Sequence, residues 1–173
     1  DNTIFGARDT VVWYSTGNKV QRNSMTSGQY GLHFMYAHDN LAEENRFRGN
    51  IVGVFVMYGD RNVVRRNRIE YSQGPSGIGI GFKEASGTIV EDNEILANAA
   101  GMYLDASPYD PEADNEIRRN RIAFNGIAMH FHSDWKGNHI TDNDFVSNHT
   151  MVAVNGAGTA LGSRWEGNHY DTF

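Results

Sequence analysis

Three side chains near the start of the sequence have the types and spacing of a soft-metal site. His33 and Met35 are two positions apart, and Met57 follows Met35 by 22 residues. If His33 and Met35 share a strand, they lie on one face with Cα atoms about 7 Å apart. One imidazole and two thioethers favour Cu(I) over Zn(II), Mg(II) or Ca(II), because soft donors select soft cations. We therefore predict a Cu(I) site at His33, Met35 and Met57; the alternative is a hydrophobic stack beneath a further segment or subunit.

A second pair of imidazoles occurs near the other end of the chain. His130 and His132 are also two residues apart, a spacing that presents both rings on one face of a strand. They lie four to five repeats from Met35, which is about 19 Å or more, so the two groups cannot share a metal ion. One interpretation is a weaker second copper or zinc site, and the other is a pair of exposed polar strand positions.

The element that must position these residues is a repeat marked by asparagine. The central series recurs at intervals of 22 to 27 residues, and two further series stand five positions before and five after it: Asn23, Asn45, Asn67, Asn93, Asn120, Asn143; Asn18, Asn40, Asn62, Thr88, Asn115, Asn138; Asn50, Ser72, Asn98, Asn125, Asn148. Such a period indicates stacked units that are each too small to bury a core. Asparagine tolerates left-handed turns and forms amide ladders when stacked. We predict an all-β fold, a single-stranded right-handed parallel β-helix (solenoid) of about seven rungs with Asn ladders at the turns.

A glycine near the middle of each repeat is expected to open a strand whose side chains alternate between the core and the surface. These glycines are Gly31, Gly53, Gly77, Gly101 and Gly126. The set that follows each glycine directly, with its i+2 neighbour, is apolar and is predicted to face inward: Leu32, Phe34, Val54, Val56, Ile78, Ile80, Met102, Leu104, Ile127, Met129. The intervening set is mixed and is predicted to face outward: His33, Met35, Phe55, Met57, Gly79, Gly81, Tyr103, Asp105, Ala128, His130.

Part of the outward face has the character of a docking ledge. When the repeats are aligned on the glycines that open their strands, Gly79 and Gly81 occupy the two outward positions of one strand and leave bare backbone beside the methionines. The aromatic residues Phe55 and Tyr103 lie on either side of them. Outward aromatic residues are common interface anchors, although glycines can also mark a bulge or a close approach. We expect a partner protein to dock at Phe55, Gly79, Gly81, Tyr103 and Asp105.

Composition limits the classes of function. The net charge is −6, and this argues against nucleic-acid binding, which needs clustered Lys and Arg. The basic doublets 65–66 and 118–119 alternate along the repeats with the acidic doublets 43–44 and 91–92, which predicts alternating charge on a solvated face. Cysteine is absent, so disulfides and thiolate metal sites are excluded. No apolar run has the length of a transmembrane helix.

The 173 residues are predicted to form one β-helix domain, residues 1–173. The sequence starts within a repeat, without an initiating methionine or a targeting segment, so we expect a fragment or processed piece of a longer solenoid.

Several segments resemble the NosD family. Residues 30–40, which include the string His33-Phe34-Met35-Tyr36, and the next repeat at residues 53–62, which includes Met57-Tyr58, are similar to consecutive stretches of that family. Residues 79–86 and 165–170 also fit, so the resemblance covers most of residues 18–170.

The resemblance implies a periplasmic, or at least extracytoplasmic, copper-binding β-helix protein without catalytic activity. Members of the family help to assemble the copper centre of nitrous oxide reductase, an enzyme of denitrification. The implied partners are a membrane ABC transporter and either a copper donor or nitrous oxide reductase itself. The implied cofactor is copper, as Cu(I).

Two other functions are compatible with a β-helix: a polysaccharide lyase or epimerase, and a non-catalytic carbohydrate-binding module. A lyase needs a positive groove for uronates, but the predicted outward columns contain no Lys or Arg, and Lys83 is the nearest basic residue. A carboxylate pair for glycoside hydrolysis would have to combine Asp105 with a loop acid.

Overall fold

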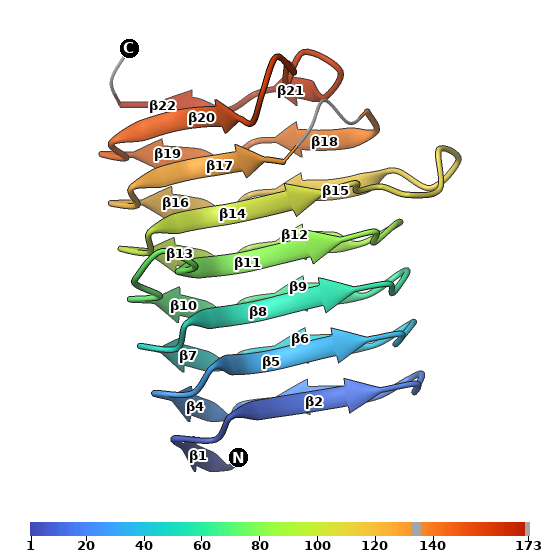
Figure 1. Ribbon diagram of the computed structural model, residues 1–173, viewed down its shortest axis with the longest axis vertical. Helices are drawn as coiled ribbons and strands as arrows, with labels where there is room; N and C mark the ends of the chain where they lie inside the picture. Colours follow the sequence, from blue (N-terminus) through green and yellow to red (C-terminus); the bar gives the residue numbers. More distant parts are fainter. Residues whose placement is uncertain (133–135, 172–173) are drawn as a thin grey trace.

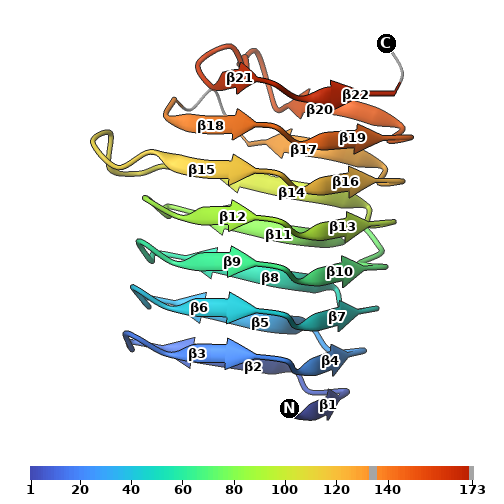
Figure 2. The same ribbon diagram turned by 180° about the vertical axis from the view of Figure 1, so that it is seen from behind.

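The chain winds into an all-β parallel solenoid of about seven turns, as predicted. The computed structural model describes residues 1–132 and 136–171, and three parallel sheets run along its axis (Figures 1 and 2). Each turn of the chain contributes one strand to each sheet, so the strands of one sheet are neighbours in space but about two dozen residues apart in sequence. No part of the described chain forms an apolar helix of membrane-spanning length.

The first sheet has eight strands, which are β1 (Thr3–Phe5), β4 (Ser24–Thr26), β7 (Arg46–Arg48), β10 (Arg68–Glu70), β13 (Glu94–Leu96), β16 (Arg121–Ala123), β19 (Asp144–Val146) and β22 (His169–Tyr170). The second has seven, which are β2 (Asp9–Trp13), β5 (Tyr30–Met35), β8 (Val52–Met57), β11 (Ile78–Lys83), β14 (Ala100–Asp105), β17 (Ile127–Phe131) and β20 (Thr150–Val154). The third also has seven, which are β3 (Lys19–Gln21), β6 (Leu41–Glu43), β9 (Val63–Arg65), β12 (Ile89–Glu91), β15 (Asn115–Arg118), β18 (Asn138–Thr141) and β21 (Arg164–Glu166).

Buried asparagine side chains link each turn of the solenoid to the next, which confirms the predicted ladders. Asn67 shows the pattern: its Oδ1 accepts from the backbone N–H and the side-chain amide of Asn45, at 2.9 and 3.0 Å. Its own Nδ2 donates to Asn93 Oδ1 at 3.0 Å and to the carbonyl oxygen of Ala42 at 2.9 Å. Each such bond contributes about 1 kcal/mol net, and leaving one of these buried groups unpaired costs more.

The second ladder is interrupted where threonine replaces asparagine. The amide chain runs from Asn18 through Asn40 to Asn62 and resumes from Asn115 to Asn138. Between the two blocks, the backbone N–H of Thr88 donates to Asn115 Oδ1, but its buried hydroxyl has no partner among the described residues.

The left-handed turns are made by the residues that precede the asparagines. In the central series these residues have φ between 51° and 56°: Arg22, Glu44, Arg66, Asp92, Arg119 and Asp142. Asparagine therefore serves as the hydrogen-bonding residue of the turn, and its tolerance of left-handed geometry is not used at these positions. The prediction located the turns correctly but assigned the backbone strain to the wrong residue.

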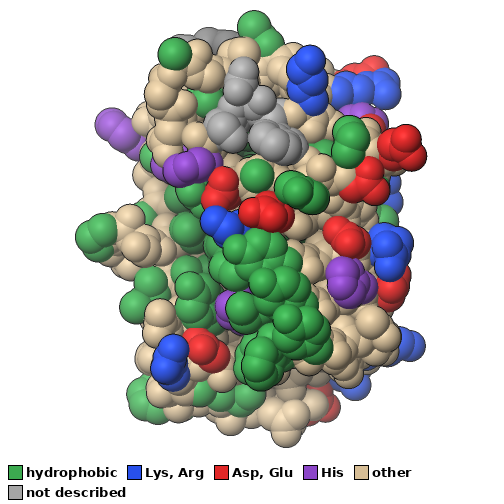
Figure 3. Space-filling view, turned by 45° about the vertical axis from the view of Figure 1, so that its right-hand side comes forward, with side chains coloured by type: hydrophobic (Ala, Val, Ile, Leu, Met, Phe, Trp, Pro, Cys, Tyr) green, Lys and Arg blue, Asp and Glu red, His purple; other side chains and the backbone are tan. Residues whose placement is uncertain are grey.

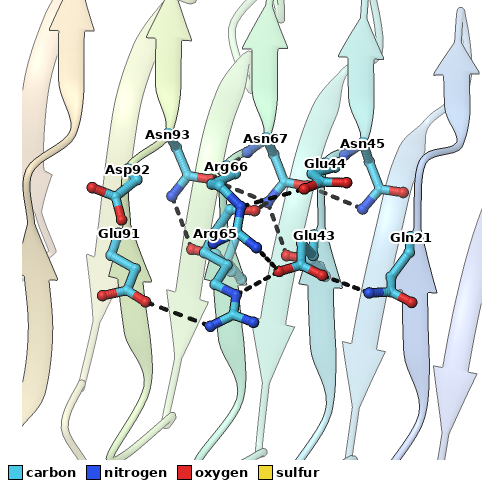
Figure 4. Close-up of polar contacts among 12 residues, drawn as sticks. Gln21, Glu43, Glu44, Asn45, Arg65, Arg66, Asn67, Glu91, Asp92 and Asn93 are labelled. Atoms are coloured by element: carbon cyan, nitrogen blue, oxygen red, sulfur yellow. Dashed lines mark hydrogen bonds and ion pairs between the residues drawn. The ribbon is translucent and has the colours of Figure 1, made fainter.

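The same left-handed residues carry the alternating charge predicted for this corner of the solenoid (Figure 4). Arg119 contacts Asp92 and Glu91 at 2.9 and 2.8 Å, while Arg66 contacts Glu43 and Glu44. Hydrogen bonds from Gln21 and Arg65 hold the pKa of Glu43 below its usual value. The sign of the charge alternates from turn to turn, so each charged residue has an opposite charge on the turns next to it. A misfolded stack that omitted one turn would instead place like charges next to each other.

The register of two strands differs from the prediction by two residues. In β11, Gly79 rather than Gly77 occupies the place of Gly53, so that Gly81 pairs with Phe55 and Lys83 with Met57. Gly77 belongs instead to the longer loop that contains Pro75, which explains the misalignment.

β17 is shifted in the same way, because Gly126 lies before the strand. Met129 pairs with Met102, and His130 pairs with Tyr103 rather than with Asp105. Ile78 and Ile127, predicted to be core residues, are therefore only half buried, whereas Ala128, predicted to face outward, is fully buried.

A nearly buried carboxylate joins three arginines on the first sheet. Glu70 has a side chain only 3% exposed, and it contacts Arg46 at 2.7 Å, Arg68 at 2.9 Å and Arg48 at 3.4 Å. Burial raises the pKa of Glu70, but the hydrogen bonds from Arg46 and Arg68 outweigh it and hold the pKa below the usual 4.5.

This cluster predicts loss of stability in acid. A carboxyl group with a depressed folded pKa stabilises the protein above its unfolded pKa and loses that contribution as pH falls through the folded value. Glu70→Gln should lower the free energy of unfolding at pH 7 by about 1–3 kcal/mol and should flatten the fall in thermal midpoint below about pH 4.5. Circular dichroism melts measure both, and Glu112→Gln on an exposed loop is the control. An unchanged acid profile in Glu70→Gln would contradict the assignment.

Candidate metal-binding surface

Three columns of side chains run along the outer face of the second sheet, near the ends of its strands. The histidine column is Val11, His33, Phe55, Gly81, Tyr103 and His130. The methionine column is Trp13, Met35, Met57, Lys83 and Asp105. The tyrosine column, one residue further along each turn, is Tyr14, Tyr36, Tyr58, Glu84 and Ala106, and every one of its residues has positive φ.

The two methionines lie side by side, as the predicted site requires. Met35 and Met57 are directly opposite each other on the parallel strands β5 and β8, whose backbones are about 4.8 Å apart. Both are half buried, while the residues before them, Phe34 and Val56, are completely buried in the core. The two thioethers therefore lie on the outer surface, at the same position of two successive turns.

The imidazole of the predicted trio is less accessible than expected. His33 is only 8% exposed, because its ring stacks on Tyr30 with centroids 4.8 Å apart and meets the edge of Phe55 at 6.0 Å. Its Nε2 has no hydrogen-bond partner among the described residues. Burial lowers the pKa of His33 below 6.5, and the charge of Asp9 only partly opposes this shift. At neutral pH His33 is therefore neutral and retains one nitrogen lone pair, the form that binds metals.

The expected docking ledge of bare glycines is not formed. Gly79 lies where the strand crosses close to the next turn: a Cβ there would be 2.5 Å from the carbonyl oxygen of Gly101. Gly81 does lie on the outer face, but the ring of Phe55 covers it, and a Cβ at Gly81 would be 2.3 Å from two ring atoms. Phe55 is consequently only 8% exposed rather than a free anchor.

The remaining residues of the expected docking surface are engaged with their neighbours. Asp105 pairs with Lys83 at 3.3 Å, and Tyr103 donates to or accepts from His132. A docking role for Phe55, Gly79, Gly81, Tyr103 and Asp105 stays a prediction, without the bare-backbone geometry on which it was based.

The structure adds an aromatic surface that the sequence reading missed. Tyr14, Tyr36 and Tyr58 stack in series, with ring centroids 4.8 Å apart in each step, and Trp13 contacts Tyr14 at 5.4 Å. Together with Met35 and Met57 they form what we call the aromatic–methionine patch. The space-filling view shows a continuous hydrophobic area of this kind, bordered by charged side chains (Figure 3). The signal was present in the sequence, since the three tyrosines recur every 22 residues.

The second histidine pair is tied into a polar network. His130 Nε2 lies 2.9 Å from Asn155 Oδ1, and His132 Nδ1 lies 2.9 Å from the hydroxyl of Tyr103 and 3.3 Å from Asn155 Nδ2. Asn155 thus bridges the two imidazoles, and a metal ion bound through these nitrogens would have to displace it. Asn155 follows β20, two turns beyond Tyr103, and no local spacing pointed to it.

A groove of about 470 Å³ lies on the outer face of the second sheet, along the first residues of β5, β8, β11, β14 and β17. Aromatic rings of Tyr30, Phe55 and Tyr103 line it, together with His130 and the loop residues Pro75 and Ser76. Within the described part of the chain, its lining contains no Lys, Arg, Asp or Glu.

The described residues contain no group of three His, Asp or Glu side chains that could hold a metal ion. The pairing of Met35 with Met57 beside His33 matches the donors that Cu(I) prefers.

Comparisons with known proteins give a family and a similar fold. A family model described as "Periplasmic copper-binding protein (NosD)" matches residues 1–173. Among solved structures, an alginate lyase from Paenibacillus sp. str. FPU-7 is similar, with a TM-score of 0.53 and 17% sequence identity over 89% of this chain and 74% of the lyase. At that identity the likeness shows a shared fold. No curated protein sequence is similar enough to count as a match.

The cover of Phe55 over Gly81 can be tested by a double-mutant cycle. Gly81→Ala should lower the free energy of unfolding by about 1–3 kcal/mol, because the new methyl group forces the Phe55 ring away. In the Phe55→Ala background the same substitution should cost little, since the space is then open. Urea unfolding of the four proteins measures the coupling. Equal costs in both backgrounds would show that the ring does not rest on the glycine.

Proposed function

Because this chain belongs to the NosD family, we propose that it is an extracytoplasmic accessory protein that binds Cu(I) and assists assembly of the copper centre of nitrous oxide reductase. The site is the trio His33, Met35 and Met57. Copper is the cargo in this role, so the protein must receive it from one partner and release it to another. The family resemblance implies that its partners are a membrane ABC transporter and either a copper donor or nitrous oxide reductase.

One observation carries the proposal: two half-buried methionines lie side by side on neighbouring strands, next to a neutral imidazole whose Nε2 has no hydrogen-bond partner among the described residues. Methionine usually fills core gaps, yet these two lie on the outer face, where packing alone does not require them. The unsatisfied Nε2 of His33 would gain a partner on binding a metal ion, and an unpaired buried polar group otherwise costs about 1–3 kcal/mol.

Partial exposure of the two methionines suits a carrier. A cargo site must exchange ligands with a partner, and thioethers at a surface can be approached from outside, whereas a closed four-ligand site holds its metal. The aromatic–methionine patch supplies an apolar surface around the two sulfur atoms, of the kind that marks protein interaction sites. No catalytic step is proposed for this chain.

Cu(I) binding should depend on the methionine pair. Met35→Leu, Met57→Leu in one chain should weaken Cu(I) binding at least about tenfold, because Leu keeps the volume but removes the sulfur. A Cu(I) competition assay with bicinchoninate under reducing conditions measures the affinity. Met151→Leu, a half-buried methionine on β20, is the matched control.

The pH dependence adds a second readout of the same site. Since the pKa of His33 is lowered from 6.5, its imidazole stays available below the pH at which an ordinary histidine is protonated. Affinity should therefore decline only below pH 6.5. Retained affinity in the double variant would remove Met35 and Met57 from the site.

The groove favours a second candidate, non-catalytic binding of a neutral saccharide. Its volume of about 470 Å³ lies in the range of small-molecule sites, and it combines ring surfaces with the polar groups of Tyr30, Ser76, Tyr103 and His130. The absence of basic side chains from the lining within the described residues makes it a poor site for uronates such as alginate.

Calorimetric titration with neutral xylo- and cello-oligosaccharides tests this candidate. Binding should occur without cleavage products and should weaken in Tyr103→Ala but not in Tyr109→Ala, an exposed loop tyrosine. Binding of alginate in preference to neutral sugars, or no binding of either, would eliminate it.

A further inference from the structure

A large exposed aromatic residue begins the methionine column. Trp13 pairs in register with Met35, as Met35 does with Met57, so the three side chains follow one another along the outer face in steps of about 4.8 Å. Trp13 is 61% exposed, and its ring is held at an interplanar angle of 46° against Tyr14. Packing in the core does not account for an indole in this place.

The other end of the column is closed to a cation. Lys83 follows Met57 in register, and an ammonium group offers hydrogen-bond donors but no lone pair for a metal ion. Its ammonium group is held in place by the carboxylate of Asp105 at 3.3 Å. A soft cation at the methionine pair therefore has a repulsive neighbour on one side and the indole on the other.

We propose that Trp13 caps the Cu(I) site, with the face of its indole against the cation bound by Met35 and Met57. The inference rests on the proposed function and adds a residue to it that neither the histidine–methionine spacing nor the family resemblance suggested. Cation–π attraction is strongest for Trp among the aromatic side chains and acts within about 6 Å of the ring. It supplies no lone pair, so the site stays coordinatively unsaturated.

The cap has consequences for selectivity. An indole face shields one side of the ion from water without offering the nitrogen or oxygen donors that Cu(II) and Zn(II) prefer. The site then discriminates for monovalent soft cations by geometry as well as by donor type. Removal of the cap by an incoming partner would need only rotation of an exposed side chain, because Trp13 is not part of the core.

Tryptophan fluorescence distinguishes the cap from a bystander. Anaerobic titration with Cu(I), and with Ag(I) as a redox-inert soft cation, should quench the emission of the wild-type protein. Most of that quenching should be absent in Trp13→Phe and Trp13→Leu but retained in Trp165→Phe, whose indole packs against Phe131 and Phe145. The dissociation constant should rise about 3- to 30-fold in Trp13→Leu and less in Trp13→Phe, following the strength of the cation–π interaction.

The outcomes separate this inference from the proposed function. If the metal binds the wild type and the methionine double variant loses it, but Trp13→Leu keeps both its affinity and the quenching, the cap is overturned and the Cu(I) site stands. If neither ion binds the wild type, both proposals fail. Circular dichroism melts of each variant establish that the exposed substitutions leave the fold intact.

Discussion

The hydrogen bonds of buried asparagine amides along the solenoid axis are the interaction on which the rest of the structure depends. Each amide of the central series accepts from one turn and donates to the next, and also to a backbone carbonyl, so it fixes spacing and register together. Asn67 makes all of these bonds while 2% exposed. Because the amides repeat at one place in every turn, residues about two dozen positions apart become neighbours about 4.8 Å apart. Every outward column, including the methionine pair, is a consequence of that alignment.

The sequence alone predicted the parallel solenoid. It also predicted which residues are neighbours on adjacent turns, wherever the turns have the same length. Met35 and Met57 are separated by 22 residues with no insertion, so their pairing followed from the period alone. The prediction was wrong for β11 and β17, because insertions carry extra glycines that imitate the one opening a strand. After the first two residues of each strand, a two-residue shift keeps the alternation of faces, so the hydrophobic pattern did not reveal the error.

The surroundings of His33 could not be predicted, for a different reason. Its burial depends on where the rings of Tyr30 and Phe55 lie, and Phe55 is free to lean over only because its neighbour on the next strand is Gly81. Contacts among side chains that belong to three different turns cannot be predicted from the spacing of residues within one repeat. Strand periodicity fixes which face a residue occupies, whereas the shapes of neighbouring side chains decide whether that face is open.

The interruption of one asparagine ladder at Thr88 affects how strongly successive turns of the solenoid are coupled. In a solenoid each turn contacts only the turns next to it, so folding cooperativity depends on the interfaces between successive turns. An interface with fewer hydrogen bonds couples its two turns more weakly. Thr88, whose hydroxyl has no partner within the described part of the chain, lies at such an interface, between the layers that carry the methionines and those that carry the bridged histidines. One of the three ladders is carried at this interface by a single backbone hydrogen bond, so the two groups of layers are joined there mainly by the other two ladders and by the sheets.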